Sequence, residues 1–211
     1  MASMGDPVCR LCRREGVRLY LKGYRCYGKK CPFAKPDVPT PPGQHGRGRQ
    51  PKLSNYGVQL REKQKLRRLY ALREKQFHIY VVEANRRTGV TGENILQLLE
   101  MRLDNVVFRL GFAASRLQSR QFVNHGHILV NGRVVGIPSF MTRPGDKISV
   151  REASRKIEPL QEAVRAAGGS RVPEWMTVNH NDLIGEVLSA PTRQQIDTDV
   201  EEALIVEFYS R

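Results

Sequence analysis

Residues 103–134 read LDNVVFRLGFAASRLQSRQFVNHGHILVNGRV, and this stretch decides the fold. Ser115 and Gln118 fit a capping box, in which a serine hydroxyl and a glutamine side chain satisfy free amides at a helix start. Gly126 supplies the stop signal that commonly follows a helix. The stretch therefore predicts a helix over residues 115–125, with a second element directly after it.

That second element is predicted to be a β-hairpin. Asn131-Gly132 separates two short apolar runs, which is the strongest short-range signal for two antiparallel strands joined by a tight turn. Pro144-Gly145-Asp146 predicts another turn, leading into a strand over residues 147–150. Further along the chain we expect a helix over 155–167 and strands over 176–178, 183–187 and 203–208.

On the predicted helix each residue is rotated by 100° from the one before it, so the side chains fall on different sides of the helix. The side expected to face the core carries Ser115, Ser119, Phe122 and Val123. One neighbouring row carries Arg116, Arg120 and Asn124, and the next carries Gln118, Gln121 and His125. Two rows of hydrogen-bond donors suit contacts with phosphate and sugar. An ordinary solvated helix face fits the same pattern.

Upstream of this helix the chain is expected to be helical and then irregular. Apolar residues at three- and four-residue steps predict helix from Glu93 to Leu110, ending at Gly111. Residues 54–88 also have a helical pattern, with many basic side chains. The connector at 32–51 holds six Pro and three Gly in twenty residues, and its second half resembles an arginine-rich arm that becomes ordered on RNA.

The charge of the chain is unevenly placed. The formal net charge of the 211 residues is +14. Residues 1–90 hold 21 Lys and Arg against 6 Asp and Glu, whereas residues 91–211 hold 14 against 15. Basic charge concentrated in one half indicates a polyanionic partner. Nucleic acid is favoured over a membrane surface, because the sequence shows no basic amphipathic helix with a wide Leu/Phe/Trp face. Without a secretory signal or a long apolar run, we expect a cytosolic, nucleic-acid-binding protein.

Four cysteines form a pattern of their own near the start of the chain: Cys9, Cys12, Cys26 and Cys31, spaced Cys-x2-Cys-x13-Cys-x4-Cys. This spacing predicts a tetrahedral metal site, because two closely spaced pairs of thiolates can close around one ion. Zinc is the first choice, and a 4Fe-4S cluster remains open. Disulfides are disfavoured in the cytosol. Lys22, Arg25, Lys29 and Lys30 are expected to lower the thiol pKa values.

Several motifs together resemble one known family. The quoted stretch, with Val130-Asn131-Gly132 and Pro144-Gly145-Asp146, looks like the small RNA-binding module named after ribosomal protein S4. Three further segments resemble the whole protein: Ser54-Asn55-Tyr56-Gly57 with 59–65, Thr88-Gly89 with 91–94, and the ending 204–211. By this near full-length resemblance, the chain is identified as a member of the bacterial small-subunit ribosomal protein S4 family, in its cysteine-containing form.

The resemblance implies a role as well as a fold. It implies a structural constituent of the small ribosomal subunit, located in the cytoplasm, that binds 16S rRNA directly at a multi-helix junction early in subunit assembly. It also implies contact with neighbouring proteins, notably the fifth of the small subunit, and a place near the mRNA entry channel. Because no catalytic constellation is evident, no enzymatic activity is expected. An RNA-modifying or regulatory protein carrying the same module, and a zinc-containing DNA-binding regulator, are the alternatives.

The expected architecture is α+β. It consists of a four-cysteine metal knuckle (1–31), the connector (32–51), a basic helical domain (52–100), an inserted RNA-binding module of two helices on a short hairpin (101–165), and C-terminal strands returning to the helical domain (166–211). The residues expected to bind RNA are Arg47, Arg49, Lys52, Tyr56, Gln59, Arg61, Lys63, Lys65, Arg67, Arg68, Ser115, Arg116, Gln118, Arg120, Gln121, Asn124, His125 and Arg133.

Overall fold

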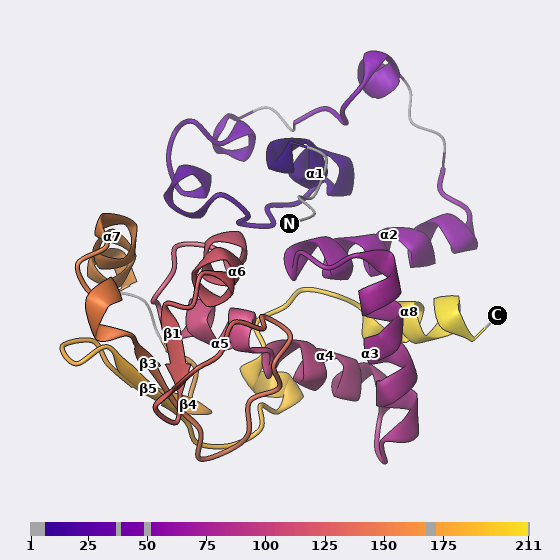
Figure 1. The fold of residues 1–211 in the computed structure, drawn as a ribbon. Helices are drawn as coiled ribbons and strands as arrows, with labels where there is room; N and C mark the ends of the chain where they lie inside the picture. Colours follow the sequence, from indigo (N-terminus) through magenta and orange to yellow (C-terminus); the bar gives the residue numbers. More distant parts are fainter. Residues whose placement is uncertain (1–6, 37–38, 49–51, 168–171, 211) are drawn as a thin grey trace. The chain divides into compact units, whose positions relative to one another are not determined.

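A computed structural model describes residues 7–36, 39–48, 52–167 and 172–210 (Figure 1). The chain divides into two compact units: residues 1–86 together with 199–211, and residues 87–198. The mixture of helices and antiparallel strands confirms the predicted α+β class. Among the helices of the described residues, none combines the length and the apolar character needed to cross a membrane.

The first unit is helical. Ser54 begins its longest helix, α2, by accepting a hydrogen bond on Oγ from the Gly57 amide at 3.2 Å. The C-terminal helix α8 packs on α2, where the Tyr56 and Phe208 rings lie 5.5 Å apart. The unit comprises α1 (Val8–Glu15), η1 (Gly23–Cys26), η2 (Pro32–Ala34), η3 (Gln44–Arg47), α2 (Asn55–Leu69), α3 (Glu74–Arg86) and α8 (Glu202–Tyr209).

The predicted strand over residues 203–208 is wrong, because this segment is helix α8. Short apolar runs such as Ala203 to Val206 have no period that separates a strand from a buried helix. The packing decides the outcome here. As a helix, the segment buries Ile205 and brings the Tyr209 ring within 6.2 Å of Phe77. The chain therefore returns to the first unit as a helix.

The second unit is built on a five-stranded antiparallel sheet with strand order β2-β1-β3-β5-β4. Its strands are β1 (Ile128–Val130), β2 (Arg133–Val134), β3 (Lys147–Val150), β4 (Met176–Asn179) and β5 (Ile184–Val187). Asn131 and Gly132 have φ values of 50° and 78°, as a hairpin turn of this kind requires, so the predicted hairpin is confirmed.

The strands after residue 175 have a different place from the one predicted. Ser149 of β3 pairs with Ile184 of β5, so β4 and β5 extend the module's own sheet. The prediction that these strands return to the helical domain is therefore wrong, whereas the two helices and the hairpin of the module are present. Pairing partners far apart in sequence are chosen by tertiary contacts, which local patterns do not contain.

The helices of the second unit are α4 (Thr91–Glu100), α5 (Leu103–Arg109), α6 (Arg116–Asn124) and α7 (Glu158–Ala167), with η4 (Glu152–Ser154) and η5 (Arg193–Gln195) as short turns. The core joins apolar residues of α5 and α6 to those of the sheet and to Trp175. α5 approaches the sheet closely at Gly185, where a Cβ atom would lie 2.5 Å from Leu110 Cδ2.

The helix predicted from Glu93 to Leu110 is interrupted, contrary to expectation. Arg102 has extended backbone with φ −70° and ψ 138°, and it forms a bridge with Met141. Its side chain is completely buried and donates to Asp104, with Nε at 2.9 Å from Oδ1. The extended backbone at Arg102 therefore separates α4 from α5.

Candidate nucleic-acid interface

Helix α6 begins as the sequence predicts, with one difference in the cap. Ser115 Oγ accepts from the Gln118 amide at 3.3 Å, but Gln118 Oε1 accepts from the amide of Ala114 at 2.7 Å, one residue earlier than in a capping box. The predicted inner side is confirmed, since Ser115, Ser119, Phe122 and Val123 are all buried. The side of α6 that faces the core is therefore the predicted one.

The first predicted donor row on α6 divides into an inner and an outer part. Arg116 has a side chain only 11% exposed; its Nε donates to Asn105 Oδ1 at 2.7 Å, and its guanidinium lies 4.7 Å from the centre of the Phe108 ring. Arg120 is 33% exposed and lies 4.0 Å from Asp104. Asn124 at the end of the row is exposed. Within this row, only Arg120 and Asn124 are therefore accessible to a partner on the outer side of α6.

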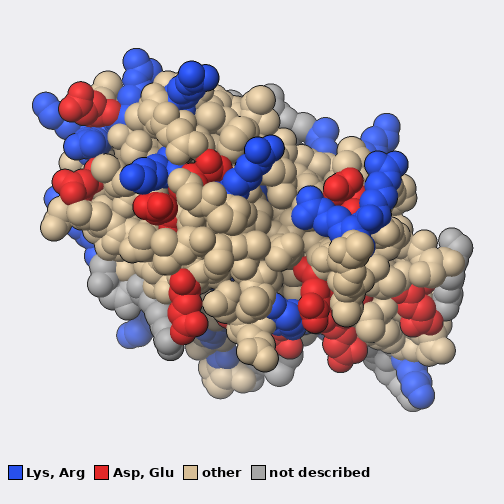
Figure 2. All heavy atoms as spheres, turned by 90° about the horizontal axis from the view of Figure 1, so that it is seen from below, with Lys and Arg blue, Asp and Glu red and all other residues tan. Residues whose placement is uncertain are grey.

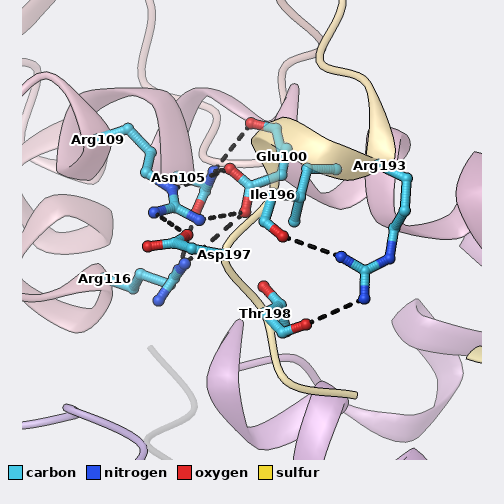
Figure 3. Close-up of polar contacts among 8 residues, drawn as sticks. All are labelled: Glu100, Asn105, Arg109, Arg116, Arg193, Ile196, Asp197 and Thr198. Carbon is cyan, nitrogen blue, oxygen red and sulfur yellow. Dashed lines mark hydrogen bonds and ion pairs between the residues drawn. The ribbon is translucent and has the colours of Figure 1, made fainter. Parts of the chain in front are cut away.

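Arg116 belongs to a polar network around a fully buried carboxylate (Figure 3). Both Glu100 oxygens accept from Arg109, with Nε at 3.0 Å and Nη2 at 2.9 Å, and Oε2 also accepts from Asn105 at 2.7 Å. A buried charge is tolerated when it is paired in this manner. The network joins the end of α4 to α5 and α6, and so it holds the base of α6 in place.

The same network reaches the segment that leads out of the second unit. Arg109 Nη1 lies 2.7 Å from Asp197 Oδ1. Arg193 donates to the backbone carbonyls of Ile196 at 3.0 Å and Thr198 at 3.3 Å (Figure 3). Sequence reasoning missed these residues. The signal in the sequence was that Glu100, Asn105 and Arg109 lie within a stretch whose apolar spacing predicts a buried helix.

The outer side of α6 continues toward the hairpin. Gln121, Asn124 and His125 are exposed, as is Arg133 on β2. The end of α6 lies against β2, because a Cβ atom on Gly126 would lie 3.4 Å from Val134 Cγ1. We name as the outer strip the exposed or partly exposed polar residues Arg120, Gln121, Asn124 and His125 of α6, together with Arg133 at the start of β2.

One histidine beside the outer strip is held in a defined setting. His127 Nδ1 lies 2.8 Å from Ser154 Oγ, and its ring centre is 5.9 Å from that of His125. Burial lowers the pKa of His127, and the positive charges of His125 and Arg151 lower it further. These causes all disfavour the charged form of His127.

In the first unit, many of the basic side chains on α2 are paired internally. Lys63 is buried, with Nζ 2.7 Å from Glu74 Oε1 and 4.6 Å above the Phe208 ring. Arg61 and Arg68 both pair with Glu15. Burial raises the pKa of Glu15, and the two arginines act against this rise. These contacts stabilise the unit, so a basic sequence run does not by itself give a basic surface.

The predicted site residues accordingly fall into three groups. Exposed are Arg47, Lys52, Tyr56, Gln121, Asn124, His125 and Arg133; partly exposed are Arg61, Lys65, Arg67, Arg68, Arg116, Gln118 and Arg120; buried are Gln59, Lys63 and Ser115. Arg49 lies outside the described residues. On the face drawn in Figure 2, Lys and Arg lie in separate groups with Asp and Glu between them, so a polyanion would meet several distinct basic groups there.

The four cysteines come together in the first unit. Cys9, Cys12, Cys26 and Cys31 are free thiols that line one cavity of about 20 Å³. Within the described residues, no set of three or more Cys, His, Asp or Glu has the geometry of a formed metal cage. The thiols thus share a cavity without closing into a tetrahedron. Four sulfur donors around one small space still match the donor set that zinc or an iron–sulfur cluster takes.

The expected lowering of thiol pKa values is not observed at two cysteines. Burial raises the pKa of Cys12, against a backbone hydrogen bond from Leu19 that lowers it. Burial also raises the pKa of Cys26, although the Lys22 amide donates to its sulfur at 3.3 Å and the Lys22 charge acts in the same direction. Desolvation therefore outweighs the neighbouring basic charge at both thiols.

Two family descriptions match consecutive parts of the chain. "Ribosomal protein S4/S9 N-terminal domain" matches residues 4–100, and "S4 domain" matches residues 101–148. Proteins titled "Small ribosomal subunit protein uS4" are 56% identical in Natranaerobius thermophilus and 57% identical in Thermoanaerobacter sp. (strain X514), each over 211 residues and 100% of both chains. A protein of Symbiobacterium thermophilum titled "uS4A" is 57% identical over the same span.

Proposed function

The chain belongs to the ribosomal protein S4 family, and from this premise we propose that it is a structural, non-enzymatic component of the small ribosomal subunit that binds rRNA. Its place is in the cytoplasm, within that subunit. The observation that carries the proposal is the outer strip: four polar side chains on the outer side of α6 and Arg133 on β2, with the start of α6 held by the buried Glu100 network.

The strip suits RNA for a physical reason. Duplex RNA is recognised mainly through phosphates and 2′-hydroxyls, which need donors of fixed position. The buried pair of Glu100 with Arg109 and the capped start of α6 supply that fixed position. Arg120 and Arg133 bring charge, and Gln121 and Asn124 bring amide donors. Arg116 contributes by holding the helix in place.

We also propose the finer role that the family resemblance implies. The chain binds 16S rRNA at a multi-helix junction early in subunit assembly, contacts the fifth small-subunit protein, and lies near the mRNA entry channel. Two compact units support binding at a junction, since each can contact a different RNA helix. The exposed residues Arg47 and Lys52 offer additional phosphate contacts from the first unit.

Co-sedimentation tests this role. The purified chain should join small subunits reconstituted from 16S rRNA when it is added with the first proteins. It should remain bound through a high-salt gradient, and its omission should leave the fifth protein poorly incorporated. A chain that washes off at high salt, or whose omission changes nothing, would contradict the structural role.

We further propose that Cys9, Cys12, Cys26 and Cys31 hold a structural metal, with zinc preferred and a 4Fe-4S cluster as the alternative. The cavity that all four line supports the assignment. So does the small apolar cluster beside it, in which only Leu11, Leu19 and Leu21 are buried. A core of this size contributes little folding free energy, and a bound metal would supply the remainder.

Elemental analysis and an absorption spectrum of chain purified anaerobically under reducing conditions test this site. We expect about one zinc per chain, or the visible absorption of a cluster. Cys26→Ser should abolish metal binding and loosen the start of the chain, while the melting of the second unit stays unchanged. A folded chain with neither metal and with four titratable thiols would contradict the assignment.

A further inference from the structure

Three tyrosines near the cysteines are exposed. The exposed fractions of Tyr20, Tyr24 and Tyr27 are 39%, 40% and 74%. The rings of Tyr20 and Tyr27 lie together, with centres 5.1 Å apart and planes tilted by 31°. Aromatic side chains usually bury a large area, and an exposed group of them marks a surface that binds something. We name these three residues the tyrosine patch.

The backbone holds the tyrosine patch in place. Leu19 and Leu21 are buried on either side of Tyr20, which itself has a positive φ of 51°. A bulky residue in the left-handed region is strained, and such strain persists only where the surroundings impose the conformation. Tyr24 lies within η1, and its carbonyl accepts from the Tyr27 amide at 3.1 Å. The rings are therefore presented from an ordered segment.

The charged residues of the segment that carries the tyrosine patch have a single sign. Between Val17 and Pro36 all six charged residues are basic and exposed: Arg18, Lys22, Arg25, Lys29, Lys30 and Lys35. Lys22 and Arg25 line the same cavity as Tyr20, so cationic groups stand next to the rings. Aromatic rings surrounded by basic side chains are the combination that binds single-stranded nucleic acid, since bases stack on the rings and cations neutralise the phosphates.

We propose that the tyrosine patch is a stacking platform for unpaired RNA bases, a second RNA-binding surface distinct from the outer strip. This inference rests on the proposed RNA-binding function and names a subsite within it. Duplex RNA fits poorly, because paired bases present no face to an aromatic ring. A protein partner also fits less well, because lysines are depleted at protein interfaces and this segment contains four of them.

Fluorescence anisotropy with the full chain tests the platform. The probes are a labelled 12-nucleotide oligoadenylate and an RNA duplex of 12 base pairs. Tyr27→Ala should weaken oligoadenylate binding about 5- to 150-fold, the range for loss of one stacked base, and change duplex binding less than about twofold. Tyr27→Phe should bind like the parent, because the ring is retained. Ile79→Ala, another exposed apolar residue of the first unit at 65% exposure, is the matched control and should change neither.

The outcomes separate the two proposals. If the parent binds neither probe nor 16S rRNA, the proposed function fails. If the parent binds both probes but Tyr27→Ala equals the parent on oligoadenylate, the platform is refuted while RNA binding stands. Loss of binding in Tyr27→Phe as large as in Tyr27→Ala would also refute stacking, since the hydroxyl would then make the contact. Unchanged RNA binding with a specific loss of protein incorporation during subunit reconstitution would assign the patch to a protein partner instead.

Discussion

Replacing Arg109 by Ala tests the buried network that supports α6. The change leaves Glu100, which is 0% exposed, without its two hydrogen bonds from Arg109; the bond from Asn105 and the guanidinium of Arg116 at 3.9 Å remain. Breaking a buried pair by removing one partner costs about 3–5 kcal/mol. This is a large part of the roughly 5–15 kcal/mol by which a native protein is stable.

The chain supplies its own reporter for this measurement. Trp175 is the single tryptophan, it is 1% exposed, and it lies in the core of the second unit. Its fluorescence during urea unfolding therefore follows that unit. With a slope of about 2 kcal/mol per molar urea, Arg109→Ala should lower the midpoint by about 2 M. Arg109→Lys, which keeps the charge but loses the two-point geometry, should lie between the parent and the Ala variant.

Asp197→Ala is the matched control, because it removes the other acidic partner of Arg109. The Asp197 side chain is 78% exposed, and an exposed ion pair contributes at most about 1 kcal/mol. The midpoint should therefore move little. If Arg109→Ala shifts the midpoint no more than Asp197→Ala does, the Glu100 pair does not stabilise the unit and the reasoning fails.

Three further predictions follow from single contacts. Arg120→Ala should weaken 16S rRNA binding by about 1–3 kcal/mol and leave the urea midpoint unchanged. Arg116→Ala should lower the urea midpoint, because this side chain lies inside the polar network; equal stability of the two variants would contradict that position. Gly185→Ala should destabilise the second unit by about 1–3 kcal/mol through its clash with Leu110, while Gly136→Ala, whose Cβ would have no neighbour closer than 3.9 Å, should not. Although burial opposes the charged form, hydrogen bonds from Lys63 and Tyr209 lower the pKa of Glu74 in the folded state. The small stabilisation from this carboxylate is present above its unfolded pKa and is lost as pH falls through the folded one. Glu74→Gln should therefore lose less unfolding free energy than the parent as pH falls below 4.5, the ordinary pKa of the group.

The sequence predicts those elements whose signals are local. Ser115 caps α6 because its hydroxyl reaches an amide three residues away, and Asn131-Gly132 turns because both residues tolerate positive φ. The inner side of α6 also follows from helical spacing alone. Such features depend on a few neighbouring residues, so they could be predicted without knowledge of the rest of the fold.

Features that depend on distant partners could not be predicted. The segment 203–208 becomes a helix because Phe208 and Tyr209 pack on α2 and α3. Arg116 turns inward because Asn105 and Glu100 lie beneath it, a contact that its place in a polar row conceals. Likewise, Lys63 looks like a surface cation in sequence, but in the fold it pairs with Glu74. In each case a tertiary contact overrides the local pattern.

Binding of the purified full-length chain to 16S rRNA as a function of salt tests the central claim most directly. If several Lys and Arg side chains contact phosphates, the logarithm of the binding constant should fall linearly and steeply with the logarithm of salt concentration. It should also remain higher for 16S rRNA than for a scrambled RNA of equal length at every salt concentration. A nearly flat dependence, or equal affinity for both RNAs, would contradict the account of this chain as an RNA-binding component of the small subunit.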